Sequence, residues 1–228
     1  PSMIRELPGA NYAITTNGAV IADLKTNKAI RTCGLSNEMV QRILNIAKKY
    51  HSATDPFIDG RAITQPSSID HMDEFGLSPQ MQKLIRDTRE VVPDVMEYVK
   101  TTGAQAEKIN IFMADLEERE ILRRELMAMP ELSISSSMYN NLEVNAKGAD
   151  KGSALLWLAD HLGISREETM AFGDGENDIP MIKAAGIGVA MENALDTVKE
   201  AADTITLNND EDGVAAAIRK FIFGSSEE

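Results

Sequence analysis

Six consecutive residues, Gly173-Asp174-Gly175-Glu176-Asn177-Asp178, combine two glycines with several side-chain oxygens. They follow an apolar, strand-like segment, Thr169–Phe172, and precede a stretch with helical spacing. Glycines allow a tight turn, so Asp174 is expected at the end of the strand, with Asn177 and Asp178 at the start of the helix. In open α/β folds, ligands bind at this carboxyl edge of a parallel sheet. Carboxylates placed there suit Mg²⁺, which is held by few protein oxygens and keeps several waters.

Other interpretations of this loop can be compared by spacing. A dinucleotide-binding Gly-x-Gly-x-x-Gly fingerprint is excluded because Asp178 occupies the third glycine position. An EF-hand is excluded because Ile179 and Ala185 stand where the calcium loop needs Gly and Glu. The simplest alternative is a solvated turn in which Asp178 caps a helix, since Asp, Gly and Asn are ordinary turn residues.

A lysine stands at the start of the preceding helix. Lys151 lies in the segment Gly148–Gly152 and opens the predicted helix Lys151–Leu162, where its charge opposes the helix dipole. An anionic ligand at the sheet edge would explain this placement, and a solvated surface lysine is the alternative. A Walker A loop is excluded because Gly152 replaces the required Ser or Thr and Gly148 lies too close.

The C-terminal part of the chain alternates short strands with helices, which predicts a parallel sheet covered on both faces. After Thr169–Phe172, the expected elements are helices at Pro180–Ala185, Leu195–Ala201 and Val214–Phe221 and strands at Gly188–Met191 and Thr204–Leu207. The early strand Tyr12–Thr15 is expected to be a further strand of the same sheet.

The middle of the chain has a different pattern. Ala19–Asp23 and Ala29–Cys33 predict one hairpin, and the turn at Asp59-Gly60 predicts another. Together with amphipathic helices they form an α+β module inserted into the α/β domain. The predicted division is a core of residues 1–21 and 141–228 and an inserted domain of residues 22–140.

Composition narrows the function classes. The 228 residues carry 23 basic and 36 acidic side chains, a net charge of −13, which disfavours nucleic acid and anionic membranes as partners. No apolar run approaches the ~20 residues of a membrane span. The single cysteine, Cys33, cannot form an internal disulfide, so a cytoplasmic protein is expected. No pattern specifies an oligomeric state.

Taken together, these motifs resemble the haloacid dehalogenase (HAD) superfamily, specifically its Cof-type sugar-phosphate phosphatases. The segments that carry the resemblance are Thr15–Ala19, Gly148–Gly152, Gly173–Asp178, Ala184–Ala194 and Asn209–Val214. The resemblance covers nearly the whole chain. It implies a Rossmann-like parallel-sheet α/β core with a large inserted α/β cap domain. It also implies Mg²⁺-dependent hydrolysis of a small phosphorylated metabolite through an aspartyl-phosphate.

The resemblance assigns roles to five residues. Asp174 and Asp178 are the expected metal residues, Asp178 acting through a water or by orienting the direct ligand. Lys151 is the expected catalytic and substrate-binding lysine that neutralises phosphoryl oxygens. Asn177 is expected to bind substrate or orient the loop. Asn17, in the segment that leads from core to cap, is expected to bind substrate.

The resemblance also indicates a missing part. In the family, the nucleophile lies in an Asp-x-Asp-Gly motif, and a second motif with Thr or Ser comes after it. Both motifs precede the segment that corresponds to Thr15–Ala19. Only eleven residues stand before Tyr12, so this chain is expected to lack both. The alternative to an active phosphatase is therefore a core-plus-cap fragment that binds Mg²⁺ and phosphate without turnover.

Two further possibilities are disfavoured. Asp210-Glu211-Asp212-Gly213 spells the nucleophile motif, but it comes last in the chain and is separated from its strand by Asn208-Asn209, so a surface loop is expected. A P-type ATPase fragment would share the Gly-Asp-Gly-x-Asn-Asp loop. The absence of a membrane span in the sequence and the short connection from Lys151 to Asp174 argue against it.

Overall fold

The structure is a computed structural model that describes residues 8–224. The chain divides into two compact units, Pro1–Ala149 (unit 1) and Asp150–Glu228 (unit 2). The division expected from the sequence, a core of 1–21 and 141–228 with 22–140 inserted, stays a prediction. Residues 1–7 of that first core segment lie outside the described residues.

Unit 1 begins with a small antiparallel sheet of order β1-β2-β3. Its strands are β1 (Tyr12–Thr15), β2 (Val20–Asp23) and β3 (Lys28–Thr32). The predicted hairpin of β2 and β3 is confirmed. The prediction that Tyr12–Thr15 continues the parallel sheet is wrong, because the turn Thr16–Gly18 reverses the chain at once and pairs β1 with β2.

The larger part of unit 1 is a six-stranded sheet of order β6-β5-β4-β7-β9-β8, antiparallel except for the pair β5–β6. The strands are β4 (Ser52–Ile58), β5 (Arg61–Thr64), β6 (Glu90–Val91), β7 (Lys108–Met113), β8 (Leu132–Ser135) and β9 (Asn141–Ala146). The tight turn at Asp59-Gly60, with φ values of 50° and 75°, confirms the second predicted hairpin.

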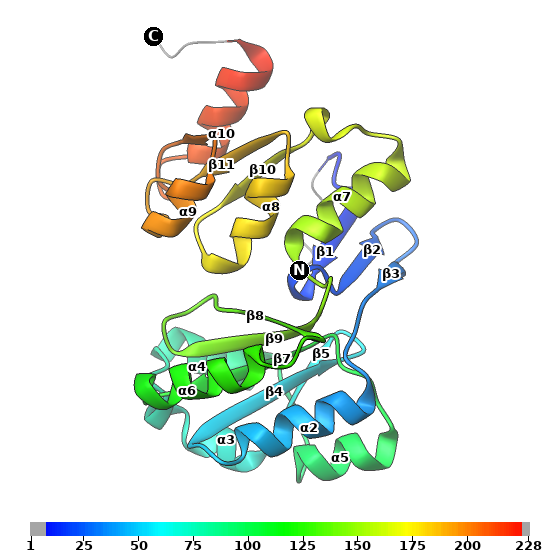
Figure 1. Cartoon of the computed structure of the whole chain (residues 1–228), viewed down its shortest axis with the longest axis vertical. Coiled ribbons are helices and arrows are strands. Elements are labelled where there is room, and N and C mark those ends of the chain that lie inside the picture. The colour runs from blue at the N-terminus through cyan, green and yellow to red at the C-terminus, as the bar shows by residue number, and fades with distance from the viewer. Residues whose placement is uncertain (1–7, 225–228) are drawn as a thin grey trace. The chain divides into compact units, whose positions relative to one another are not determined.

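Side chains of the six-stranded sheet alternate between two faces. On β7, Ile109, Ile111 and Met113 enter the main core, which α2 (Asn37–Ala47), α5 (Val95–Thr102) and α6 (Leu116–Met127) also line (Figure 1). A second core forms with Phe112 on the opposite face. It is completed by α3 (Pro66–Asp70), the 3₁₀ turn Met72–Phe75 and α4 (Pro79–Thr88).

Unit 2 is built on three parallel strands in the order β10-β11-β12. They are β10 (Met170–Gly173), β11 (Ile187–Ala190) and β12 (Thr204–Ile205). The helices are α7 (Lys151–Leu162), α8 (Ile179–Ala184), α9 (Asp196–Ala201) and α10 (Gly213–Ile218), with short turns at Arg166–Glu168, Glu176–Asp178 and Arg219–Phe223. The predicted alternation of strands and helices is confirmed.

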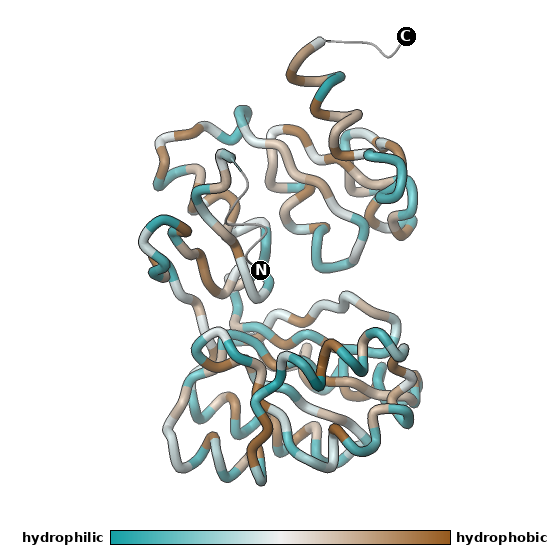
Figure 2. Tube along the Cα trace, turned by 180° about the vertical axis from the view of Figure 1, so that it is seen from behind, coloured by the Kyte–Doolittle hydropathy of each residue, from teal (hydrophilic) through white to brown (hydrophobic). Residues whose placement is uncertain are grey.

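Apolar contacts position the carboxyl ends of these strands. Ile182 on α8 packs with Ala190 of β11 and with Val198 of α9 in one buried cluster. The loop Asp174–Asp178 after β10 is hydrophilic, and Figure 2 shows teal segments of this kind in unit 2. No helix within residues 8–224 is long and apolar enough to cross a membrane.

Candidate functional site

The loop that follows β10 is tied together by one carboxylate. Asp178 is buried, and its Oδ2 accepts hydrogen bonds from the backbone N–H groups of Asp174 and Gly175, each at 3.0 Å. A Cβ at Gly173 would lie 2.2 Å from the Cβ of Asp178, so only glycine fits at the end of β10. Asp178 therefore closes the turn with its side chain. This side chain is buried and does not cap α8, which differs from the solvated helix cap considered as the simplest alternative.

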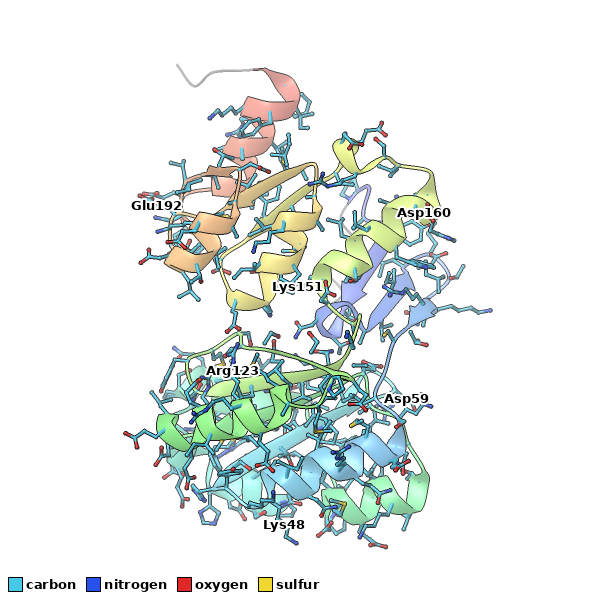
Figure 3. The ribbon with its side chains drawn as sticks, viewed as in Figure 1. Lys48, Asp59, Arg123, Lys151, Asp160 and Glu192 are labelled. Atoms are coloured by element: carbon cyan, nitrogen blue, oxygen red, sulfur yellow. The ribbon has the colours of Figure 1, made fainter. Side chains whose placement is uncertain are left out.

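The other oxygen of Asp178 pairs with Lys151. The Lys151 Nζ lies 2.5 Å from Asp178 Oδ1, and the two side chains are 27% and 8% exposed. Lys151 is the first residue of α7, as predicted, and Figure 3 shows it at the beginning of that helix. The helix is capped by Asp150, whose carboxylate accepts the N–H of Ser153 at 2.8 Å.

Close packing of two helices brings this lysine to the loop. A Cβ at Gly152 would lie 2.3 Å from the carbonyl oxygen of Pro180, so α7 and α8 approach each other more closely there than any other residue permits. The ion pair gives Lys151 a partner within the chain, which the sequence did not predict. It offsets the cost of placing a cation at a helix N-terminus.

Asp174 presents an exposed carboxylate at the end of β10. Its Oδ2 accepts a hydrogen bond from the side-chain amide of Asn193 at 3.0 Å, and its carbonyl oxygen accepts the N–H of Leu195 at 3.2 Å. Asn193 lies in the loop after β11, on which Figure 3 labels Glu192. In the sequence, Asn193 stands out only as part of the longer segment Ala184–Ala194, although its position just after a parallel strand is a usable signal.

Asn177 belongs to the same loop. It is half-buried in the turn Glu176–Asp178, and its Oδ1 would lie 3.0 Å from a Cβ at Gly175. The side chain therefore folds back over this glycine. Unit 2 thus contains four of the five predicted site residues, and three of them belong to the single loop after β10.

Asn17 belongs to unit 1. Thr16, Asn17 and Gly18 all have positive φ values, 49°, 58° and 94°, which is uncommon for threonine and asparagine. The reversal directs the Asn17 amide to Glu143 Oε2 at 2.8 Å and to Asn145 Oδ1 at 3.3 Å. Its role in substrate binding stays a prediction.

The donor set can be compared with what Mg²⁺ requires. Among residues 8–224, no group of three or more His, Cys, Asp and Glu side chains is arranged to hold a metal ion. Mg²⁺ commonly uses only one or two carboxylates and otherwise water and substrate oxygens. Since Asp178 is occupied by Lys151 and the loop amides, Asp174 is the carboxylate that fits a direct ligand. Asp178 accepts the backbone N–H of Asp174, which fits the expectation that it orients the direct ligand; its role stays a prediction.

Comparisons with known proteins agree with these motifs. A family model for haloacid dehalogenase-like hydrolases matches residues 2–218. The 5-amino-6-(5-phospho-D-ribitylamino)uracil phosphatase YcsE of Bacillus subtilis (strain 168) is 50% identical over 114 residues, which cover 49% of this chain and 46% of YcsE. The chain thus spans slightly less than half the length of this curated relative.

Solved structures share the fold over most of the chain. A haloacid dehalogenase-like hydrolase from B. subtilis matches with a TM-score of 0.81 and 27% identity, covering 92% of this chain and 79% of that protein. The HAD subclass IIB sugar phosphatase BT4131 matches with a TM-score of 0.75 and 27% identity, covering 92% and 75%. The expected α/β fold with a cap domain is confirmed. With a family model that extends over residues 2–218, the chain belongs to the haloacid dehalogenase-like hydrolases.

Proposed function

We propose that the protein containing this chain is a Mg²⁺-dependent phosphatase of small phosphorylated metabolites, acting through an aspartyl-phosphate. The main support for the proposal is the ion pair of Lys151 and Asp178. The same Asp178 carboxylate also binds the backbone N–H of Asp174, whose own carboxylate is exposed. The loop after β10 therefore holds both the Lys151 ammonium group and the Asp174 carboxylate at the carboxyl edge of a parallel sheet. Open α/β folds bind their ligands at such an edge.

Each residue has a distinct task in this proposal. The Lys151 ammonium group neutralises phosphoryl oxygens and holds the phosphoryl group in place. Asp178 keeps the lysine and the loop amides in place. Asn177 donates a hydrogen bond to substrate or orients the loop. Mg²⁺, when bound at Asp174, would supply charge neutralisation for the phosphoryl group.

The proposed substrate is a phosphate monoester of a sugar or a polyol. Support comes from the relatives, of which one is named a phosphatase of a ribitylaminouracil phosphate and another a sugar phosphatase. The chain's net charge of −13 does not oppose such a small ligand, because capture is local. The proposed location is the cytoplasm.

Hydrolysis of p-nitrophenyl phosphate by the purified chain tests the proposal. If the chain hydrolyses this ester, the activity should need Mg²⁺, stop on addition of a chelator and be abolished by Asp174→Ala. Activity that survives Asp174→Ala would contradict the proposed role of this loop. Phosphate binding without hydrolysis would support the alternative, a chain that binds Mg²⁺ and phosphate without turnover.

A further inference from the structure

Three loops of unit 2 are joined by hydrogen bonds between side chains and backbone. Asp174 follows β10, Asn193 lies in the loop after β11, and Asn209 lies in the loop after β12. Asp174 Oδ2 accepts from Asn193 Nδ2 at 3.0 Å, and Asn193 Oδ1 accepts from the backbone N–H of Asn209 at 3.0 Å. The contacts thus cross the sheet edge in the same order as the strands, β10-β11-β12.

The two contacts together determine which way the Asn193 amide points. A side-chain amide has one acceptor oxygen and one donor NH₂ group. Because the backbone N–H of Asn209 can only donate, it requires the oxygen of Asn193 on its side. The NH₂ group must then face Asp174, where a carboxylate oxygen accepts it. The orientation therefore follows from the chemistry of both neighbours.

The loop that contains Asn193 is hydrogen-bonded to the end of β10 both before and after Asn193. The N–H of Met191 donates to the carbonyl of Gly173 at 3.0 Å, and the N–H of Leu195 donates to the carbonyl of Asp174 at 3.2 Å. Both contacts anchor the loop after β11 to the end of β10. Asn193 consequently has a defined position relative to the Asp174 carboxylate.

The loop that carries Asn209 is also well defined. Glu211 donates its N–H to the carbonyl of Asn208 at 3.2 Å, which closes a turn with Asn209 at its second position. Gly213 lies so close to Leu207 that a Cβ would be 2.1 Å from the Leu207 carbonyl oxygen. The donor at Asn209 is thus fixed by the backbone, and its own side chain takes no part in the contact with Asn193.

We infer that Asn193 is a positioning residue for the metal ligand Asp174, and that Asn209 supports it through its backbone N–H alone. By holding Oδ2, the Asn193 amide fixes the orientation of the Asp174 carboxylate, whose other oxygen would be the one to hold the cation. The inference rests on the proposed function, which makes Asp174 a Mg²⁺ ligand. It adds a role for the loops after β11 and β12, which otherwise have no part in the site.

Binding of Mn²⁺, a paramagnetic substitute for Mg²⁺, tests this inference in the whole chain through water-proton relaxation. Groups that orient a metal ligand are worth about 10- to 100-fold in metal affinity. Asn193→Ala should therefore weaken Mn²⁺ binding about tenfold or more. Asn209→Ala, which keeps the backbone N–H, should bind Mn²⁺ like the unaltered chain.

Asn209→Pro provides the matched variant, because it removes the N–H at a turn position that accepts proline. It should weaken Mn²⁺ binding as Asn193→Ala does, while circular dichroism and the melting temperature show that each variant is folded. Unchanged affinity in Asn193→Ala would overturn the inference and leave the proposed function standing. Weakening in Asn193→Ala but not in Asn209→Pro would overturn the part assigned to Asn209. The proposed metal role itself would fall if the unaltered chain and Asp174→Ala bound Mn²⁺ equally, or if neither bound it.

Discussion

Asp178 links the loop after β10 to the first residue of α7. Its carboxylate accepts hydrogen bonds from two backbone N–H groups of the loop and pairs with Lys151. The Asp178 side chain is buried, with only 8% of its surface exposed. A buried carboxylate is costly unless it is paired and hydrogen-bonded. Loss of either partner should therefore affect stability as well as ligand binding.

Lys151→Ala tests this coupling. The variant leaves Asp178 without its cation, and its free energy of unfolding should fall by roughly 1–3 kcal/mol in urea titrations. Phosphate binding should be lost in the same protein. Lys183→Ala, which removes an exposed lysine of the same unit, is the control and should change neither quantity by much. Equal effects of the two substitutions would contradict the assigned role of Lys151.

Asp210 tests the exclusion of the second Asp-x-Asp-Gly segment. Its backbone N–H donates to Asn208 Oδ1 within a surface loop, and its side chain is exposed. Asp210→Asn should leave both phosphatase activity and Mn²⁺ affinity unchanged. A large loss of hydrolysis of p-nitrophenyl phosphate would identify Asp210 as a catalytic residue and overturn the assignment.

The residue types at the site could be predicted from the sequence, but several contacts could not. Asp174, Asp178 and Lys151 were recognisable because they stand where a strand ends or a helix begins. The pairing of Lys151 with Asp178 depends on the close approach of α7 and α8, which no local pattern reports. Asn193 was missed as a site residue because its partner Asp174 belongs to another loop.

Whether a helix or strand was predicted correctly depends on the residues at its ends. Helix α7 was predicted with its observed bounds, since Gly163 ends it in a left-handed conformation. The pairing of β1 was wrong because three successive positive φ values at Thr16–Gly18 turn the chain back on itself. Asn-Gly is typical of a hairpin turn, so Asn17-Gly18 was a usable signal for this reversal, although a positive φ is rare for threonine.

Gly152 connects the two helices that place Lys151. An alanine methyl group there would lie 2.3 Å from the Pro180 carbonyl oxygen and would force α7 away from α8. Gly152→Ala should lower the free energy of unfolding by about 1–3 kcal/mol, as overpacking does, and weaken phosphate binding because Lys151 moves. Gly163→Ala at the end of the same helix is the control. It meets nothing within 4 Å, so any loss of stability there should leave phosphate binding intact.

The whole molecule combines two compact units with a strong negative charge. Its parallel strands β10 to β12 and the different pattern of the middle of the chain could be predicted because strand and helix periods change along the sequence. The buried polar contacts of the six-stranded sheet could not, since they depend on cross-strand neighbours. Lys108 Nζ lies 2.6 Å from Glu143 Oε1, and both side chains are largely buried.

Glu143 predicts a pH dependence of stability. Burial raises the pKa of its carboxyl group, but the charge of Lys108 and the hydrogen bonds of Lys108, Asn17 and Ser137 outweigh burial, so the net pKa is lowered. A carboxyl group whose pKa is lowered by folding stabilises the fold fully above its unfolded value, about 4.3, and this contribution is lost as the pH falls through the folded-state value. Glu143→Gln should therefore cost roughly 2 kcal/mol at pH 7 and less near pH 3. Urea unfolding at both pH values measures the difference, and a cost that does not depend on pH would contradict the ionised pair.

Calorimetric titration of the chain with inorganic phosphate, with and without Mg²⁺, tests the central claim most directly. The account predicts that Mg²⁺ increases the affinity for phosphate, that Asp174→Ala removes this increase, and that Lys151→Ala weakens phosphate binding in both conditions. Phosphate affinity that is indifferent to Mg²⁺ and to both substitutions would contradict it.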